Sequence, residues 1–502
     1  LLPACLAMGA TLPVLTEHCA GEDFHGNLAR LYAANTLGAA MGPLLADFYL
    51  IRHLGIFGTS LLASSIDLGV GVIGWLILTS KASRQPAITS AQLALRERVL
   101  FFATGYCSLC LEILWIRILV FFNLADVYAF SIVVSTFLGG LFLGSVLSTA
   151  LARRFSLGTL LWGVSLGIVM SLACALAVHD VRLSLKIENF NQARFFTAAF
   201  LILPVTVLLG AIFPLQCDRV KDRGAVGAVG QAYLWNTLGS LLGSLSAGFV
   251  LLPTLGLQAS VLWVAVLAML AALLAEPRRW LLRLSLLALV AMSLGAPRDL
   301  LVKSLYREDY KNILFLKEDS YGAIALIRQW NPVSWDYDNN LVVDRFNMMS
   351  NNLSAKRYAA TLSALPLLVH PDPEKTLVIC FGLANTASVA VGSARSKQVD
   401  CVELTPTVVE ATGRLDYIKA TLANPKFHLI YEDGRNFLAT TAKRYDIITA
   451  EPPPPIQAGV VNLYTREYFE QCRRCLKPGG MVTHWLPVQD RKSTCLNSSH
   501  LV

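Results

Sequence analysis

Two patterns of hydrophobic and polar residues divide the chain. Residues 1–296 form long apolar runs with short polar breaks, whereas residues 303–485 alternate shorter apolar and polar segments. A membrane-spanning helix needs roughly 17–25 apolar residues. Runs of about that length fall near 1–16, 28–52, 54–79, 98–122, 126–151, 157–179, 195–216, 230–252 and 255–275. The pattern predicts a polytopic α-helical membrane domain over residues 1–296.

An internal repeat links the two ends of this apolar half. Residues 8–58 match 209–259 at a constant offset of 201 residues, and one example is the shared Asn-Thr-Leu-Gly at 35–38 and 236–239. Six apolar runs fit into one period, which predicts a parallel duplication of six helices plus six. This arrangement resembles the two halves of major-facilitator transporters. It also predicts an N-terminal truncation, with about three further helices before Leu1.

Basic residues concentrate in the breaks between apolar runs, which accounts for the net charge of +8 without a nucleic-acid partner. Lys81, Arg84, Arg96 and Arg98 crowd one connection. An excess of basic residues predicts that this loop is cytoplasmic. The run at 280–296 is short for a span and carries Arg283, so we expect it to lie in the membrane interface. We therefore predict a multi-pass inner-membrane protein in contact with the lipid bilayer, with its soluble part in the cytoplasm.

The second half predicts two small domains. Residues 303–352 hold short alternating segments at Ile313–Leu316, Ala323–Gln329 and Leu341–Val343, with turn residues at Tyr321-Gly322 and Asn339-Asn340. They predict a small antiparallel β domain. From residue 353 to 487, strands alternate with helices, the pattern of a doubly wound, Rossmann-like α/β sheet. The strands are expected at Thr376–Phe381, Gln398–Val402, Phe427–Tyr431, Tyr445–Ala450 and Met481–Leu486, and residues 488–502 are excluded as a non-native or disordered tail.

Ligand-type residues follow four of these strands. In open α/β sheets, ligands bind beyond the carboxyl ends of the strands. Gly382 follows the first strand at a tight turn, and Glu403 ends the second strand at the spacing where an acidic residue takes a ribose diol. Asp433-Gly434 ends the third, where a carboxylate can accept an adenine amino proton. Glu451 ends the fourth, before four prolines. Together they predict an adenosyl ligand across the sheet edge.

At this point residues 313–487 resemble the spermidine synthase-like (polyamine aminopropyltransferase) family, in particular its membrane-fused bacterial members. The motifs are Leu365-Pro366-Leu367-Leu368-Val369-His370-Pro371, Val402-Glu403, Asp433-Gly434-Arg435, Tyr445-Asp446-Ile447-Ile448, Asn462-Leu463-Tyr464-Thr465 with Tyr468-Phe469, and Leu476-Lys477-Pro478-Gly479-Gly480. The resemblance implies attack of a small amine or polyamine on the propyl carbon beside the sulfonium of decarboxylated S-adenosylmethionine. S-adenosylmethionine itself is the alternative donor. A homo-oligomer through the small β domain is a further implied partner.

The resemblance also implies roles for individual residues. Glu403 would bind the ribose hydroxyls, Asp433 the adenine, and Glu451 would take the place of the catalytic aspartate. Tyr358 falls where the family has a tyrosine that orients the amine. The attacking amine must lose a proton, and a carboxylate within hydrogen-bond reach can accept it.

The sequence departs from the family at several of its positions. Three alternate glycines of the turn after the first strand are here Cys380, Gly382 and Ala384. We expect the Ala384 methyl group to stand where backbone should approach the ligand. Polar groups that would grip the distal amine are replaced by Ala360, Ala364 and Pro454.

Two other functions compete with the enzyme. One is a membrane transporter whose soluble domain senses an adenosyl ligand, and the other is a degenerate, non-catalytic domain kept for interaction. Cys472 and Cys475 form a CxxC, but no second pair or histidine cluster completes a zinc site. We therefore expect two packing residues on a helix there, and no metal.

Overall fold

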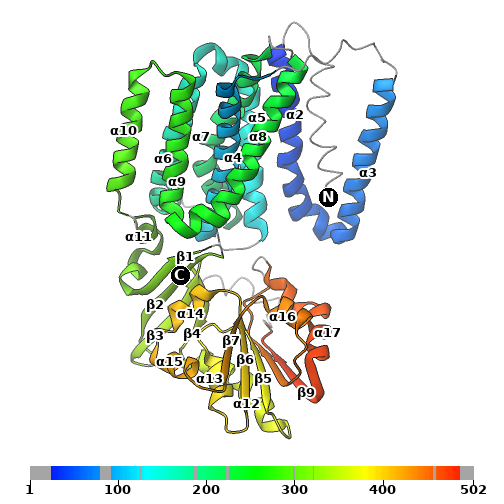
Figure 1. Ribbon diagram of the computed structural model, residues 1–502, viewed down its shortest axis with the longest axis vertical. Helices are drawn as coiled ribbons and strands as arrows, with labels where there is room; N and C mark the ends of the chain where they lie inside the picture. Colours follow the sequence, from blue (N-terminus) through cyan, green and yellow to red (C-terminus); the bar gives the residue numbers. More distant parts are fainter. Residues whose placement is uncertain are drawn as a thin grey trace. The chain divides into compact units, whose positions relative to one another are not determined.

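The computed structural model describes residues 24–79, 92–123, 127–184, 190–221, 225–297, 300–319, 321–455 and 459–486. The chain divides into two compact units, 1–123 with 128–305, and 124–127 with 306–502 (Figure 1). The predicted span at 1–16 and the predicted tail at 488–502 lie outside the described residues.

The first unit is built of apolar helices. They are α2 (Phe24–Leu45), α3 (Ile51–Thr79), α4 (Leu95–Asn123), α5 (Val127–Arg154), α6 (Leu157–Ser184), α7 (Phe190–Asp218), α8 (Ala225–Ser246), α9 (Leu252–Ala275), α10 (Trp280–Gly295) and α11 (Leu300–Tyr306), with π-helical turns η1 (Ala46–Leu50) and η3 (Ala247–Leu251). Within the described residues, six helical stretches are long and apolar enough to cross a membrane, or seven if the bent pair α10–α11 is one span. The prediction of several apolar helices is confirmed at this level.

The repeated sequence adopts the same local structure twice. α8 and η3 begin 201 residues after α2 and η1. Gly55 (φ 69°, ψ 175°) and Gly256 (φ 75°, ψ 172°) then interrupt α3 and α9 at equivalent places. In effect only glycine occupies this backbone region. Both helices are kinked at these glycines, where the sequence pattern separates two predicted spans.

Small residues allow helices of this unit to approach closely, as their glycines predict. A Cβ atom added to Gly239 on α8 would lie only 2.0 Å from the carbonyl oxygen of Phe102 on α4. One turn earlier on α8, the amide of Asn236 donates to the carbonyl oxygen of Phe101 at 3.3 Å. A larger side chain at Gly239 would therefore force these two helices apart.

The second unit begins with a four-stranded antiparallel sheet in the order β1 (Ile313–Glu318), β2 (Ala323–Asn331), β3 (Asp336–Val343) and β4 (Phe346–Ser350). The predicted turn at Asn339-Asn340 is wrong, because both residues pair with β2 inside β3. The hairpin instead turns after Asn331, whose side chain accepts from the amide of Val333 at 2.9 Å. β4 was not predicted. It follows a tight turn in which Asp344 and Arg345 both have positive φ.

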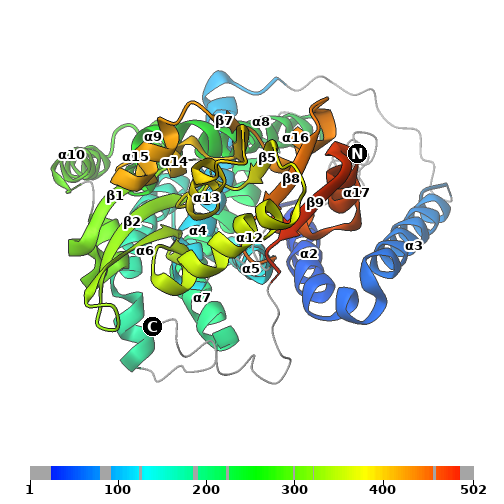
Figure 2. The same ribbon diagram turned by 90° about the horizontal axis from the view of Figure 1, so that it is seen from below.

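The remaining strands form one parallel sheet in the order β7 (Phe427–Tyr431), β6 (Gln398–Glu403), β5 (Lys375–Ile379), β8 (Tyr445–Ala450) and β9 (Leu476–His484). The helices are α12 (Leu353–Val369), α13 (Asn385–Gly392), α14 (Pro406–Thr412), α15 (Asp416–Leu422), α16 (Gly434–Thr440) and α17 (Arg466–Cys475). Alternate side chains of each strand point to opposite faces. Val378 accordingly packs with α13–α15, whereas Leu377 and Ile379 pack with α16 and α17 (Figure 2). The Rossmann-like prediction is confirmed.

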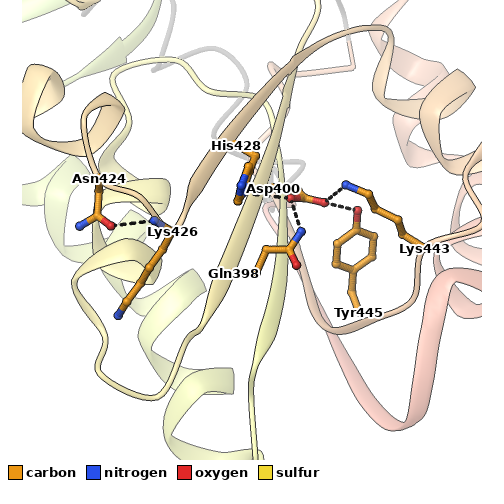
Figure 3. A network of polar contacts seen from close by, with 7 residues as sticks. All are labelled: Gln398, Asp400, Asn424, Lys426, His428, Lys443 and Tyr445. Atoms are coloured by element: carbon orange, nitrogen blue, oxygen red, sulfur yellow. Dashed lines mark hydrogen bonds and ion pairs between the residues drawn. The ribbon is translucent and has the colours of Figure 1, made fainter.

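A buried carboxylate ties together the amino ends of three strands (Figure 3). Asp400 on β6 is fully buried and accepts hydrogen bonds from Gln398 at 2.8 Å, Lys443 at 2.7 Å and the Tyr445 hydroxyl at 2.8 Å. His428 on β7 lies 3.6 Å from the same carboxylate. Burial alone would raise the pKa of Asp400, but these donors lower it. The network fixes the sheet at the end opposite to the predicted ligand site.

Candidate active site

A cavity of 490 Å³ lies at the carboxyl ends of the parallel strands. It is lined by turn residues after β5, β6, β7 and β8 and by side chains of the small antiparallel sheet, including Ile324, Leu341 and Met349. Five of the six predicted site residues line this one cavity: Gly382, Glu403, Asp433, Gly434 and Glu451. The sixth, Tyr358, lies on α12 beside Glu451.

The turn after β5 has an unusual backbone. Cys380, Gly382 and Ala384 have φ values of 73°, 51° and 54°, all in the left-handed region that favours glycine. Cys380 and Gly382 line the cavity. The prediction for Ala384 is wrong: its methyl group is fully buried in the core against α13 and α14, and it does not line the cavity. Alanine in place of glycine at position 384 therefore strains the backbone, which has a φ of 54°, but does not obstruct the cavity.

Glu403 supports the turn after β5 from the neighbouring strand. Its carboxylate accepts from the amide of Phe381 at 2.8 Å and from the amide of Thr405 at 3.0 Å. Burial raises the pKa of Glu403, and the backbone amides around it oppose that shift. The same carboxylate that was predicted to bind a ribose diol therefore also fixes the backbone of the turn.

Asp433 lies at the amino end of α16 as its N-cap. One carboxylate oxygen accepts from the amides of Arg435 and Asn436, both at 2.9 Å. Gly434 follows because a Cβ atom there would lie 2.6 Å from the Ile379 side chain. The cap holds the carboxylate at the wall of the cavity, where it can accept a hydrogen bond from an N–H group of a ligand.

Glu451 follows β8 and is 7% exposed. Its Oε2 accepts from the hydroxyl of Thr386 on α13 at 2.8 Å, whereas Oε1 is buried without a hydrogen-bond partner among the described residues. Burial raises the pKa of Glu451. Burial, and then the charge and hydrogen bonding of the neighbouring Glu451 carboxylate, raise the pKa of Tyr358. A buried acceptor without a donor is costly, so Oε1 favours a ligand that carries N–H groups.

The cavity is acidic as a whole. Its lining contains the carboxylates of Glu403, Asp433 and Glu451 against the single guanidinium of Arg435. Burial, and then these three carboxylates, raise the pKa of the Cys380 thiol well above its ordinary value. Cys380 is therefore a neutral wall residue, and the cavity favours cationic ligands.

The sequence interpretation missed Thr386 as a site residue. Its hydroxyl donates to one oxygen of the Glu451 carboxylate. Nothing in the sequence signals this contact, because the two residues are 65 positions apart. The proline loop after Glu451 is also anchored from a distance, by the Tyr464 hydroxyl, which donates to the carbonyl of Pro453 at 2.9 Å.

Comparison with known proteins supports the resemblance. Residues 355–492 match the family model described as Spermine/spermidine synthase domain. A polyamine aminopropyltransferase of Methanocaldococcus jannaschii is 28% identical over 173 residues, which are 34% of this chain and 57% of that protein. A polyamine aminopropyltransferase of Oceanobacillus iheyensis is 22% identical over 450 residues, 81% of this chain and 83% of that protein. The predicted spermidine synthase-like domain is confirmed for the C-terminal part of the chain.

Two further similarities complete the comparison. Putrescine N-methyltransferase 2 of Nicotiana tabacum is 26% identical over 178 residues, 35% of this chain and 45% of that protein. A crystal structure of spermidine synthase in complex with the transition-state analogue AdoDATO aligns with a TM-score of 0.32 and 20% identity, over 34% of this chain and 57% of that chain. The chain spans little more than half the length of the first relatives it matches, at 57% and 52%.

Proposed function

We propose that the spermidine synthase-like domain transfers an aminopropyl group from decarboxylated S-adenosylmethionine to a small amine or polyamine. The observation that carries the proposal is the unpartnered, buried Oε1 of Glu451 in an acidic cavity. A cationic amine supplies both the missing N–H donor and the opposite charge. The sulfonium group of the nucleoside donor is also cationic, so the acidic residues that line the cavity attract it as well.

The proposed reaction uses the residues as follows. Glu403 and Asp433 bind the ribose and adenine of the donor, and Gly382 and Gly434 line the cavity beside it. Glu451, oriented by Thr386, accepts the proton that the attacking amine loses. The amine nitrogen forms a bond to the propyl carbon, the carbon–sulfur bond breaks, and its electron pair stays on sulfur as a neutral thioether. Tyr358 orients the amine from the other side of the Glu451 carboxylate.

The setting of the reaction is part of the proposal. We place the apolar helical unit in the inner membrane, as a major-facilitator-like duplication, and residues 303–487 in the cytoplasm with the nucleotide pool. The six apolar stretches and the equivalent bends at Gly55 and Gly256 support this arrangement. A homo-oligomer through the small antiparallel sheet belongs to the same proposal.

The test is a product assay on the full chain. Decarboxylated S-adenosylmethionine and S-adenosylmethionine are each incubated with a panel of mono-, di- and polyamines, and products are identified by mass spectrometry. The proposal expects an aminopropylated amine with the first donor. Methylated amine with the second donor would make the site an N-methyltransferase, the activity named for the Nicotiana relative.

The alternative is a transporter whose soluble domain senses an adenosyl ligand or no longer binds one. Its support is the replacement of polar family positions by Ala360, Ala364 and Pro454. Nucleoside binding without product from any amine would favour the sensor. Absence of binding would favour the degenerate domain.

A further inference from the structure

The helical unit contains a second cavity, of 270 Å³, where α4 and α6 begin and α7 ends. Its polar wall consists of Arg96, Glu97, Gln216 and Arg219, and the rest of its lining is apolar. All of its lining residues belong to the helical unit.

The Gln216 side chain has a hydrogen-bond donor that no described residue accepts. The side chain is 3% exposed, although it lies on the cavity wall. Its Oε1 accepts from the Thr104 hydroxyl at 3.3 Å, and its Nε2 has no partner in the described part of the chain. Buried amide N–H groups are nearly always paired. A ligand that places an acceptor atom beside Nε2 would therefore bind favourably in this cavity.

The charges around the cavity specify what kind of acceptor fits. Within the described ranges, no hydrogen bond or ion pair engages the Arg219 guanidinium, and the nearby charges that act on it are those of Glu276 and Arg96. Arg96 is held at the cavity wall because its Nε donates to the carbonyl of Leu274 at 2.9 Å. The amino ends of α4 and α6 add positive partial charge.

The two nearby acids are already engaged. Glu97 accepts from the amide of Ala94 at 2.8 Å, which directs its carboxylate to the amino end of its own helix. Glu276, which is not on the wall, pairs with Arg279 at 2.8 Å. Positive charge and donors thus exceed acceptors in this cavity.

We infer that this cavity binds a phosphate-bearing anion, with Gln216 Nε2 and the Arg219 guanidinium as donors. A guanidinium matches phosphate oxygens in a fork that places two N–H groups on two oxygens. The anion is either the headgroup of an anionic phospholipid, whose glycerol would suit the apolar wall, or a free phosphate. An amide turned to present Oε1 to the cavity would lack this donor, so a bound anion selects the orientation with Nε2 inward.

The experiment measures stabilisation of the full chain by two probes. The detergent-solubilised protein is titrated with inorganic phosphate, and the same protein is placed in nanodiscs of phosphatidylcholine with or without phosphatidylglycerol. Thermal unfolding is followed for the wild type, Arg219→Gln and Gln216→Leu. Arg278→Gln is the matched control, because Arg278 is an exposed arginine near the end of α9 that does not line the cavity.

The inference expects saturable stabilisation of the wild type and Arg278→Gln. In Arg219→Gln the apparent affinity should fall about ten- to a hundredfold, the usual effect of losing hydrogen bonds to a charged group. Gln216→Leu should weaken binding in the same direction. An effect of phosphate alone identifies a free anion, and an effect of phosphatidylglycerol alone identifies a lipid headgroup. Equal responses of wild type and both cavity variants in both arms would overturn the inference.

Discussion

Replacement of Glu451 by glutamine tests the proposed base with little change of shape. The amide oxygen can still accept the Thr386 hydroxyl, which now bonds to Oε2 at 2.8 Å, so α13 and β8 stay linked. The amide nitrogen takes the place of an oxygen that has no donor among the described residues. The variant therefore loses proton affinity and charge but retains its packing.

The expected loss follows from the role of the base. General-base catalysis contributes about 10²–10⁴-fold, which corresponds to about 3–5 kcal/mol of transition-state stabilisation. Turnover with decarboxylated S-adenosylmethionine and an accepted amine should fall by that factor in Glu451→Gln. Donor binding, measured by titration calorimetry, should change little because Glu451 is not proposed to hold the nucleoside.

Glu374→Gln is the matched control. Glu374 immediately precedes β5, at the opposite end of the sheet, where it pairs with Lys397. It should leave turnover unchanged. Unchanged turnover in Glu451→Gln would refute the reasoning and assign proton removal to another group.

Three more predictions concern pH, stability and topology. Burial raises the pKa of Glu451, and hydrogen bonding to Tyr358 and Thr386 lowers it, so activity should rise with pH as Glu451 deprotonates. In Thr386→Val the acid limb of the pH–rate profile should move to higher pH; an unmoved limb would separate Thr386 from catalysis. Asp400→Asn should lower the free energy of unfolding by about 1–3 kcal/mol at neutral pH. The main reason is that the buried Tyr445 hydroxyl loses its charged acceptor. The ion pair with half-exposed Lys443 contributes less because solvent screens it. Because the pKa of Asp400 is lowered in the folded state, this contribution is present above the ordinary aspartate pKa of 3.8 and is lost as pH falls through the folded value. Denaturant unfolding of the wild type and Asp400→Asn at neutral and at acid pH checks this prediction. The same difference in stability between the two proteins at both pH values would contradict the role given to the Asp400 network. Finally, a cysteine at Val333, which is 90% exposed near Asn331, should resist impermeant thiol reagents in intact cells; labelling from outside would overturn the cytoplasmic location.

The sequence predicted the structure best where the local pattern of hydrophobic and polar residues determines the secondary structure. Phe427–Tyr431 was predicted with the bounds the structure gives, because a short apolar run between turns is typical of a strand, even though this one is the edge strand β7. The carboxyl-end rule also brought Glu403, Asp433 and Glu451 to one cavity. These predictions depend only on chain order and strand period.

Predictions failed where contacts between distant residues control the structure. Asn339 resembles a turn residue, but its amide donates to the Asn351 side chain at 2.7 Å, which keeps it in a strand. Ala384 was expected to face the ligand, and its burial depends on how α13 and α14 pack on the sheet. The Thr386–Glu451 contact likewise joins the first turn of α13 to the end of β8, which lie far apart in the sequence.

The most direct test of the central claim is titration of the full chain with decarboxylated S-adenosylmethionine. The variant is Glu403→Gln, and the control is Glu410→Gln, whose carboxylate is exposed and pairs with Lys317 at 2.7 Å. Saturable binding is predicted for the wild type and the control. In Glu403→Gln the affinity should fall by about 1.5–3 kcal/mol, the usual value for hydrogen bonds to a charged group. No binding by the wild type, or equal affinity in Glu403→Gln, would contradict the assignment of this cavity to an adenosyl donor.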